Sequence, residues 1–169
     1  MTVRPDQSQQ RSDEIDALIA RWDAQQERYL PQREERFRIM LDVVGQQEET
    51  QRLRVLDLCC GTGSISRRVL ERFPHASILA VDFDPAHLEL GRLSLGDRVE
   101  WQDADLRRDE WAAGLEGGSF DAILTATAIH WLQPGEIVTL YGTLARLLRE
   151  GECSRTPITS PSPQSRSRR

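Results

Sequence analysis

A short segment of the chain combines a carboxylate with a glycine-containing turn, and a second carboxylate follows further along. Asp57 lies in the apolar run Val55–Leu58, and the glycine-containing turn Cys59–Gly63 comes directly after it. Glycines between a buried strand and a helix let the backbone approach a ligand closely, and the start of the helix offers free N–H groups. Asp82 ends the next apolar run, 19 residues after the turn. A carboxylate there can accept hydrogen bonds from both hydroxyls of a ribose, so we expect a nucleoside-containing ligand.

The residues around this turn distinguish two classes of nucleoside cofactor. A nicotinamide-binding turn would place a third glycine at position 66, where this chain has Ser66. Two phosphates would also pass close to Asp57, four residues before Gly61, and the carboxylate would repel them. The same carboxylate suits a ligand with a cationic end, such as the amino group of a methionine moiety. The sequence therefore disfavours a dinucleotide.

Four short apolar runs alternate with helical patterns, and these elements must position the two carboxylates. The expected strands are residues 55–58, 78–81, 99–102 and 120–126. Helices are expected from residue 64 to near Pro74, after Pro85, as a short turn around Trp111, and from Pro134 onwards. Strands alternating with helices form right-handed βαβ units and a parallel sheet covered on both faces. The sequence thus predicts the α/β class with a doubly wound parallel sheet.

The two ends of the chain lack this pattern. Residues 1–11 are polar and are expected to be disordered. From Ser12 or Asp13 the apolar positions fall on one face of a helix that breaks at Tyr29–Pro31, and a second helix follows, so we expect residues 12–50 to form a helical cap. Residues 153–169 hold five Ser, three Pro and four Arg, which predicts a disordered tail.

Length and composition limit the classes of protein that fit. The 169 residues suffice for one domain, and 38% of them are hydrophobic, which predicts a folded core. The net charge of −5 argues against nucleic acid as a partner, and no apolar run is long enough for a membrane partner to be expected. The three cysteines show neither a disulfide framework nor the spacing of metal ligands. We expect a cytoplasmic protein without a metal site, and the sequence leaves its oligomeric state open.

Four segments together resemble the cofactor motifs of class I S-adenosylmethionine-dependent methyltransferases. The resemblance covers about residues 12–152, and the segments, in family order and spacing, are Asp57–Gly63, Val81–Pro85, Val99–Leu106 and Phe120–Leu124. It implies a Rossmann-like fold, S-adenosylmethionine as cofactor and methyl transfer as activity. The family sheet has seven strands, and this chain supplies four before the tail. Residues 51–152 are therefore expected to form a partial methyltransferase domain without the C-terminal strands of the fold.

The resemblance assigns cofactor contacts to the first two segments. Gly61, Thr62 and Gly63 would admit the methionine half of the cofactor. Asp57 would hold its amino group, directly or through water. Asp82 would bind the ribose diol.

The remaining contacts come from the later segments. Phe83 would pack on the adenine, and Asp105, followed by Leu106, would meet the adenine amino group. Asp103 is the competing choice if the third strand is read two residues shorter. Thr125, at the end of the fourth strand, would line the site beside the sulfonium.

The methyl acceptor is less well specified. Family members that methylate amino groups of bases or protein amides carry an Asn/Asp-Pro-Pro-aromatic tetrapeptide after the fourth strand, where this chain has Thr125–Ala128. We therefore expect a small-molecule acceptor, methylated by in-line displacement. His130 is the candidate general base if the acceptor must lose a proton, and its alternative role is a hydrogen bond to a loop carbonyl. Tyr29 is a candidate lid contact.

Three functions remain open from the sequence. The leading one is a methyltransferase, with the activity of the truncated chain undecided. The others are a cofactor-binding remnant without catalysis and a binding module whose basic tail contacts a partner. All 22 basic residues are Arg, as in a GC-rich gene, and our hypothesis is that residues 153–169 are an out-of-frame reading of such a gene. Translation beyond codon 152 in the other two frames tests it, since neither frame yielding Gly and an apolar strand pattern would refute it.

Overall fold

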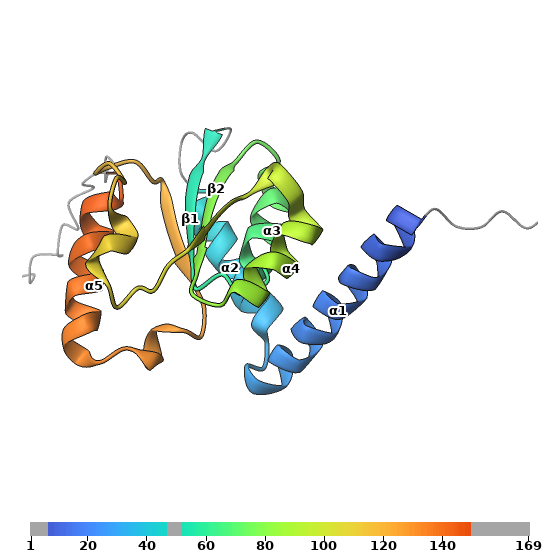
Figure 1. Ribbon diagram of the computed structural model, residues 1–169. Coiled ribbons are helices and arrows are strands. Elements are labelled where there is room, and N and C mark those ends of the chain that lie inside the picture. The colour runs from blue at the N-terminus through green and yellow to red at the C-terminus, as the bar shows by residue number, and fades with distance from the viewer. Residues whose placement is uncertain (1–6, 47–51, 150–169) are drawn as a thin grey trace, which may run out of the picture.

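The computed structural model describes residues 7–46 and 52–149, which form a four-stranded parallel sheet with helices on both faces (Figure 1). The strands are β1 (Arg54–Leu58), β2 (Ser77–Asp82), β3 (Glu100–Asp103) and β4 (Ala122–Thr125). Their order across the sheet is β3-β2-β1-β4, so β1 and β2 are central. This arrangement confirms the α/β class and the doubly wound parallel sheet.

The helices form two layers, because successive side chains of a strand point to opposite faces of the sheet. One layer is α2 (Arg33–Val44), α3 (Ser64–Arg72) and α4 (Pro85–Leu95), and the other is α5 (Pro134–Leu147) with the short helix η3 (Asp109–Ala112). On the first face, the sheet contributes Val55, Ile78, Ala80, Ala122 and Leu124 to the core. On the second face, it contributes Leu56, Leu58, Leu79 and Val81. None of the helices in the described part of the chain is long and apolar enough to cross a membrane.

The first helix, α1 (Gln7–Tyr29), begins earlier than the sequence predicts. Residues 7–11 belong to the helix, so the expected disorder of residues 1–11 is wrong for this part. The prediction relied on apolar periodicity, whereas residues 7–11 are Gln, Ser and Arg, polar residue types that such a pattern does not detect. The Gln10 side chain also donates to Glu14 Oε1 at 3.2 Å, one turn further along. The tail beyond residue 152 lies outside the described residues.

A network of charged side chains attaches α1 to the helix layer that contains α2 and α3. Asp23 Oδ1 accepts hydrogen bonds from Ser64 Oγ at 2.6 Å and from Arg33 Nη1 at 2.9 Å. Arg68 approaches the other Asp23 oxygen at 3.6 Å, and the guanidinium groups of Arg33 and Arg68 lie 4.6 and 4.9 Å from the centre of the Phe37 ring. Because Ser64 is the first residue of α3, this network fixes α1 beside the start of that helix.

The edge strand β4 is shorter than the sequence predicts. The predicted strand covered residues 120–126, but Asp121 instead exchanges two hydrogen bonds with Arg54, at 2.7 and 2.8 Å. Phe120 forms a parallel bridge with Leu148, where its N–H donates to Leu147 O and its carbonyl accepts from Arg149 N–H. The chain therefore returns to this edge directly after α5.

The core under α5 depends on the fully buried Leu147, which is 0% exposed. Replacing Leu147 by Ala removes apolar contacts and leaves a cavity, so we expect the free energy of unfolding to fall by about 2–5 kcal/mol. Urea denaturation of the full chain measures this change. Val138→Ala on the exposed side of the same helix is the control, with an expected effect within about 0.5 kcal/mol. Equal effects of the two substitutions would contradict the packing of α5 on the sheet.

Candidate cofactor site

The turn between β1 and α3 has the open backbone that a ligand needs. Gly61 and Gly63 have φ angles of 56° and 81°, and Cys59 adopts a similar angle of 54°. At Gly63 a side chain would also collide with Trp101, because the indole Cη2 lies 2.8 Å from the position of a Cβ. At Gly61 no heavy atom lies within 4 Å of that position. Space for a ligand therefore remains above Gly61.

Asp57 lies at the end of β1 and is 0% exposed. Its Oδ2 accepts hydrogen bonds from the backbone N–H and the hydroxyl of Ser66, at 3.0 and 2.7 Å. Its Oδ1 is buried and has no hydrogen-bond partner in the structure. Burial raises the pKa of the Asp57 carboxyl to about 7, against the lowering effect of Ser66, and the charge of Asp82 raises it further. A cationic group near Oδ1 would stabilise the ionised form.

Asp82 ends β2 and holds the glycine turn from the other side. Its Oδ2 accepts from Gly61 N–H at 2.8 Å, and its Oδ1 accepts from Asp84 N–H at 2.9 Å. Each oxygen keeps a second lone pair for a ligand hydroxyl. The next residue, Phe83, is 66% exposed, and an aromatic ring this exposed offers a face on which a flat base can stack.

A pocket of about 560 Å³ lies beside Phe83, and residues predicted to contact the cofactor line it. Its lining includes Phe83, Asp103 and Asp105, together with Trp111. Arg107 binds both oxygens of Asp105, with Nη2 at 2.6 Å from Oδ2, and this contact holds the pKa of Asp105 at about 2. Asp105 is therefore charged and already paired. Leu106 packs partly buried against the core.

The segment after β4 carries the remaining predicted residues. The Thr125 hydroxyl is buried without a hydrogen-bond partner, and Thr127 has a φ of 61°, which is rare for a β-branched residue. His130 is exposed, and its ring lies 5.0 Å from that of Trp131, which is 79% exposed. Among the residues that the structure describes, no carboxylate is paired with His130 to orient it as a base, so this role stays a prediction.

Most of the unpaired buried polar atoms in the described residues gather at one edge of the sheet. In residues 7–46 and 52–149, four side-chain atoms are buried without a hydrogen bond, namely Asp57 Oδ1, Thr62 Oγ1, Thr125 Oγ1 and Ser119 Oγ. The first three lie at or just beyond the carboxyl ends of β1 and β4. Open α/β sheets bind ligands at this edge, between strands whose connections run to opposite faces. These atoms, together with the open turn, fit a polar ligand with a cationic end.

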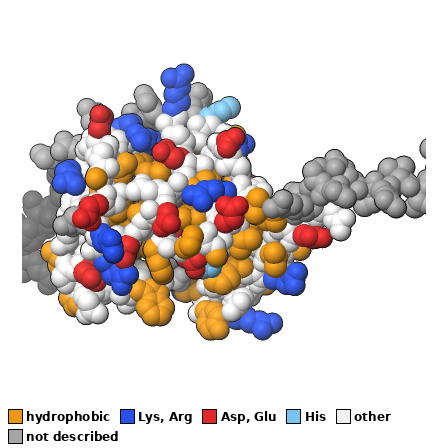
Figure 2. All heavy atoms as spheres, viewed as in Figure 1, with side chains coloured by type: hydrophobic (Ala, Val, Ile, Leu, Met, Phe, Trp, Pro, Cys, Tyr) orange, Lys and Arg blue, Asp and Glu red, His pale blue; other side chains and the backbone are white. Residues whose placement is uncertain are grey.

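Hydrophobic side chains are also exposed at this edge. Figure 1 shows β4 ending at the lower edge of the molecule, where α5 begins and α1 turns into α2. Figure 2 shows hydrophobic side chains gathered along the same lower edge. Phe83 after β2, Trp131 after β4 and Tyr29 at the end of α1 are the large exposed residues of these segments.

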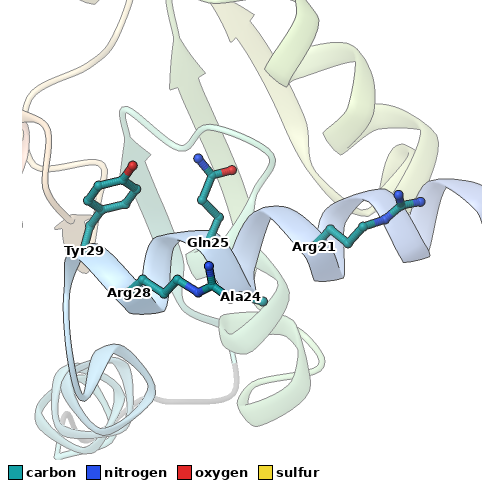
Figure 3. Close-up of a pocket in the computed structure, with 5 residues that line it drawn as sticks. All are labelled: Arg21, Ala24, Gln25, Arg28 and Tyr29. Carbon is teal, nitrogen blue, oxygen red and sulfur yellow. The ribbon is translucent and has the colours of Figure 1, made fainter.

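The predicted lid residue Tyr29 borders a second pocket, of about 630 Å³, on one side of α1. The other residues that line this pocket are Arg21, Ala24, Gln25 and Arg28 (Figure 3). We call it the α1 pocket. Figure 3 shows Gln25 and Tyr29 projecting from the same side of the helix, while Arg21 and Arg28 extend along it.

A methyltransferase-domain family model matches residues 55–151 of the chain. The chain belongs to this methyltransferase family. Its resemblance to the S-adenosylmethionine-dependent class is thereby confirmed, and with it S-adenosylmethionine as the family's cofactor. The match begins in β1 and runs beyond the described residues.

Curated relatives extend the match toward the N-terminus. A trans-aconitate 2-methyltransferase of Azoarcus sp. (strain BH72) is 35% identical over 130 residues, which are 77% of this chain and 47% of that protein. A malonyl-[acyl-carrier protein] O-methyltransferase of Paenibacillus sp. (strain JDR-2) is 31% identical over 103 residues, 58% of this chain and 36% of that protein. The chain thus spans less than half the length of these relatives.

The fold is shared with solved methyltransferase structures. An S-adenosylmethionine-dependent methyltransferase from Mesorhizobium loti superposes with a TM-score of 0.55 at 24% identity, over 69% of this chain and 49% of that one. At this identity the likeness concerns the fold alone. It agrees with the Rossmann-like sheet predicted for this chain.

Sequence reasoning missed three residues of the α1 pocket. Arg21, Gln25 and Arg28 follow one another at intervals of four and three, which places them on one face of a helix. The prediction used only the apolar face of the same helix, which indicates packing against the rest of the fold. Sequence reasoning also missed the role of Arg107, whose side chain donates to the carboxylate of Asp105, the residue assigned to the adenine amino group.

The raised pKa of Asp57 predicts a pH dependence of stability. Because its pKa rises from 3.8 in the unfolded chain to about 7 in the fold, the native state holds a proton that the unfolded state loses between these values. This group therefore stabilises the fold most below pH 4, and its contribution falls as the pH rises towards 7.

Asp57→Asn removes this contribution, and the amide oxygen can still accept from Ser66. We expect its unfolding free energy to decrease less between pH 4 and 7 than that of the wild type. Urea denaturation at several pH values measures the difference. Parallel pH profiles would rule out a raised pKa for Asp57.

Proposed function

We propose that the chain binds S-adenosylmethionine at the carboxyl edge of the sheet and takes part in methyl transfer to a small-molecule acceptor. The observation that carries this proposal is the gathering of unpaired buried polar atoms from Asp57, Thr62 and Thr125 around the open glycine turn. A buried polar group without a partner is costly, so a ligand that supplies partners is favoured there. The family supports the identity of that ligand.

The proposed contacts follow the geometry of the site. Gly61, Thr62 and Gly63 leave room for the amino-acid end, and the free Asp57 oxygen would bind its ammonium group. The Asp82 carboxylate, which already accepts one backbone N–H on each oxygen, would accept the ribose hydroxyls with its remaining lone pairs. Opposite charge and burial make the Asp57 contact the strongest of these.

The adenine end would occupy the pocket beside β3. Phe83 would stack on the base, with Leu106 near its edge. The Asp105 carboxylate can accept from the adenine amino group with lone pairs that Arg107 leaves free, because a carboxylate offers about four such positions. Thr125 would lie beside the methyl group.

The bound cofactor supplies a methyl group that its sulfonium already activates. The protein's part is to align donor and acceptor and to exclude water, because the bond from methyl to acceptor would form as the bond to sulfur breaks, without a covalent intermediate on the protein. His130 would act as a base only for an acceptor that loses a proton.

A small molecule is the acceptor class that the relatives and the charge of the chain favour. The two relatives are named for methylating trans-aconitate and a malonyl group on acyl-carrier protein. The net charge of −5 is unfavourable for a nucleic acid partner. The segment after β4 also lacks the Asn/Asp-Pro-Pro-aromatic tetrapeptide.

Calorimetric titration of the full chain with S-adenosylhomocysteine tests the cofactor part of this proposal. Asp82→Asn keeps the shape of the side chain but removes its charge and one acceptor oxygen, so we expect affinity to fall at least about tenfold, or 1.4 kcal/mol. Asp97→Asn, an exposed acid outside the site, is the matched control and should bind as the wild type does. Absence of binding to the wild type would refute the proposal, and binding without turnover on any acceptor would favour the non-catalytic alternative.

A further inference from the structure

Trp101 extends from the edge strand β3 toward the glycine turn of the proposed cofactor site. It pairs with Ala80 of β2, which pairs in turn with Asp57 of β1, so the three residues form one row across the sheet. Paired residues of parallel strands project from the same face, here the face that α3 and α4 cover. Because Ala80 is small and fully buried, it leaves the space that the indole needs to cross β2.

The outer edge of the indole lies between two glycines. Trp101 Cη2 is 2.8 Å from the position of a Cβ at Gly63, the last residue of the turn. The same atom lies still closer to the position of a Cβ at Gly91, in the middle of α4, where the three nearest atoms all belong to the indole. A glycine inside a helix lowers stability relative to alanine, and the room that it gives to the indole explains Gly91.

Other contacts hold the indole against Gly63. Its Nε1 donates to Gly96 O, 3.4 Å away in the segment that follows α4. Leu95 Cδ1 lies 3.1 Å from the position of a Cβ at Gly63, so a second apolar side chain closes the same side of the turn. The turn therefore meets a fixed apolar surface on the side of α4.

Gly63 connects the turn to α3. Its N–H donates to Cys60 O within the turn, and its carbonyl accepts from Arg67 N–H, which begins the helix, both at 2.9 Å. Ser66, in the first turn of the same helix, donates both of its hydrogen bonds to Asp57. A displacement of Gly63 would therefore move the turn together with the donors that hold the buried carboxylate.

We propose that Trp101 is a positioning residue of the cofactor site, which fixes the turn through Gly63. This inference rests on the proposed binding of S-adenosylmethionine and adds a residue outside the expected contacts. Trp101 is not among the described residues that line the pocket beside Phe83, so it acts through the backbone of the turn. A turn already held in its ligand-bound shape loses less conformational entropy on binding, which raises affinity.

Two substitutions separate this role from ordinary packing. Trp101→Leu removes the ring atoms that reach both glycines. Adding Gly91→Ala returns a methyl group to the α4 side of the emptied space, and alanine also favours the helix, so the double variant should regain stability without restoring the contact with Gly63. Trp101→Phe keeps more of the packing and takes the place of Trp101→Leu if that variant does not fold.

Leu147→Ala is the matched control for lost stability. Leu147 belongs to the core on the opposite face of the sheet, under α5, so its truncation destabilises the fold without touching the turn. Each full-length variant is titrated calorimetrically with S-adenosylhomocysteine, and its urea midpoint is measured.

We expect the affinity for S-adenosylhomocysteine to fall at least about fivefold in Trp101→Leu. It should stay low in the Trp101→Leu/Gly91→Ala variant, although the urea midpoint of that variant recovers. Leu147→Ala should bind as the wild type does despite its lower midpoint. Wild-type affinity in Trp101→Leu, or affinity that recovers together with the midpoint in the double variant, would overturn the proposal.

Hydrogen exchange of the ligand-free proteins reports the turn directly. The N–H groups of Gly61 and Gly63 both donate hydrogen bonds, so their exchange rates increase when the turn opens. We expect faster exchange at these positions in both Trp101 variants and wild-type exchange in Leu147→Ala.

The two measurements distinguish failure of this inference from failure of the proposed function. If S-adenosylhomocysteine does not bind the wild type, the proposed function fails, while faster exchange in the Trp101 variants still supports the hold of Trp101 on the turn. If the wild type binds it and the exchange of the turn is the same in every variant, the proposed cofactor site remains and the role of Trp101 fails.

Discussion

The buried carboxylate of Asp57 is the constraint on which the site depends. It lies at the end of a central strand, and its two hydrogen bonds come from Ser66 in the first turn of α3. Strand, turn and helix are thereby joined through one side chain, and the glycine turn between them is held in a fixed shape. The remaining oxygen of Asp57 is left without a partner, so this joint also creates a position that favours positive charge.

Much of the fold could be predicted because the sheet is buried on both faces. Its strands appear as short apolar runs, and the N-cap residue Asp84, which accepts from Ala86 N–H at 2.9 Å, marks a helix start. Interactions between distant side chains left no such signal. The Arg107–Asp105 pair and the polar face of α1 leave the hydrophobic pattern of the sequence unchanged, so the pattern could not predict them. The early start of α1 at Gln7 likewise lies in a polar segment. Apolar periodicity predicts what is buried and is silent about polar residues that meet on the surface.

The bridge between Phe120 and Leu148 has a consequence for the open edge of the sheet. Hydrogen bonds from Gly118 to Arg146, from Phe120 to Leu147 and from Arg149 to Phe120 align the end of α5 with the segment before β4. An edge strand with free backbone groups is a template for another strand, in any register that the side chains allow. Here the first pairing is already made within the chain and is parallel. A strand that continued along β4 from this point would inherit its register and direction, and a foreign strand could pair with Phe120 only by displacing Leu148 and Arg149.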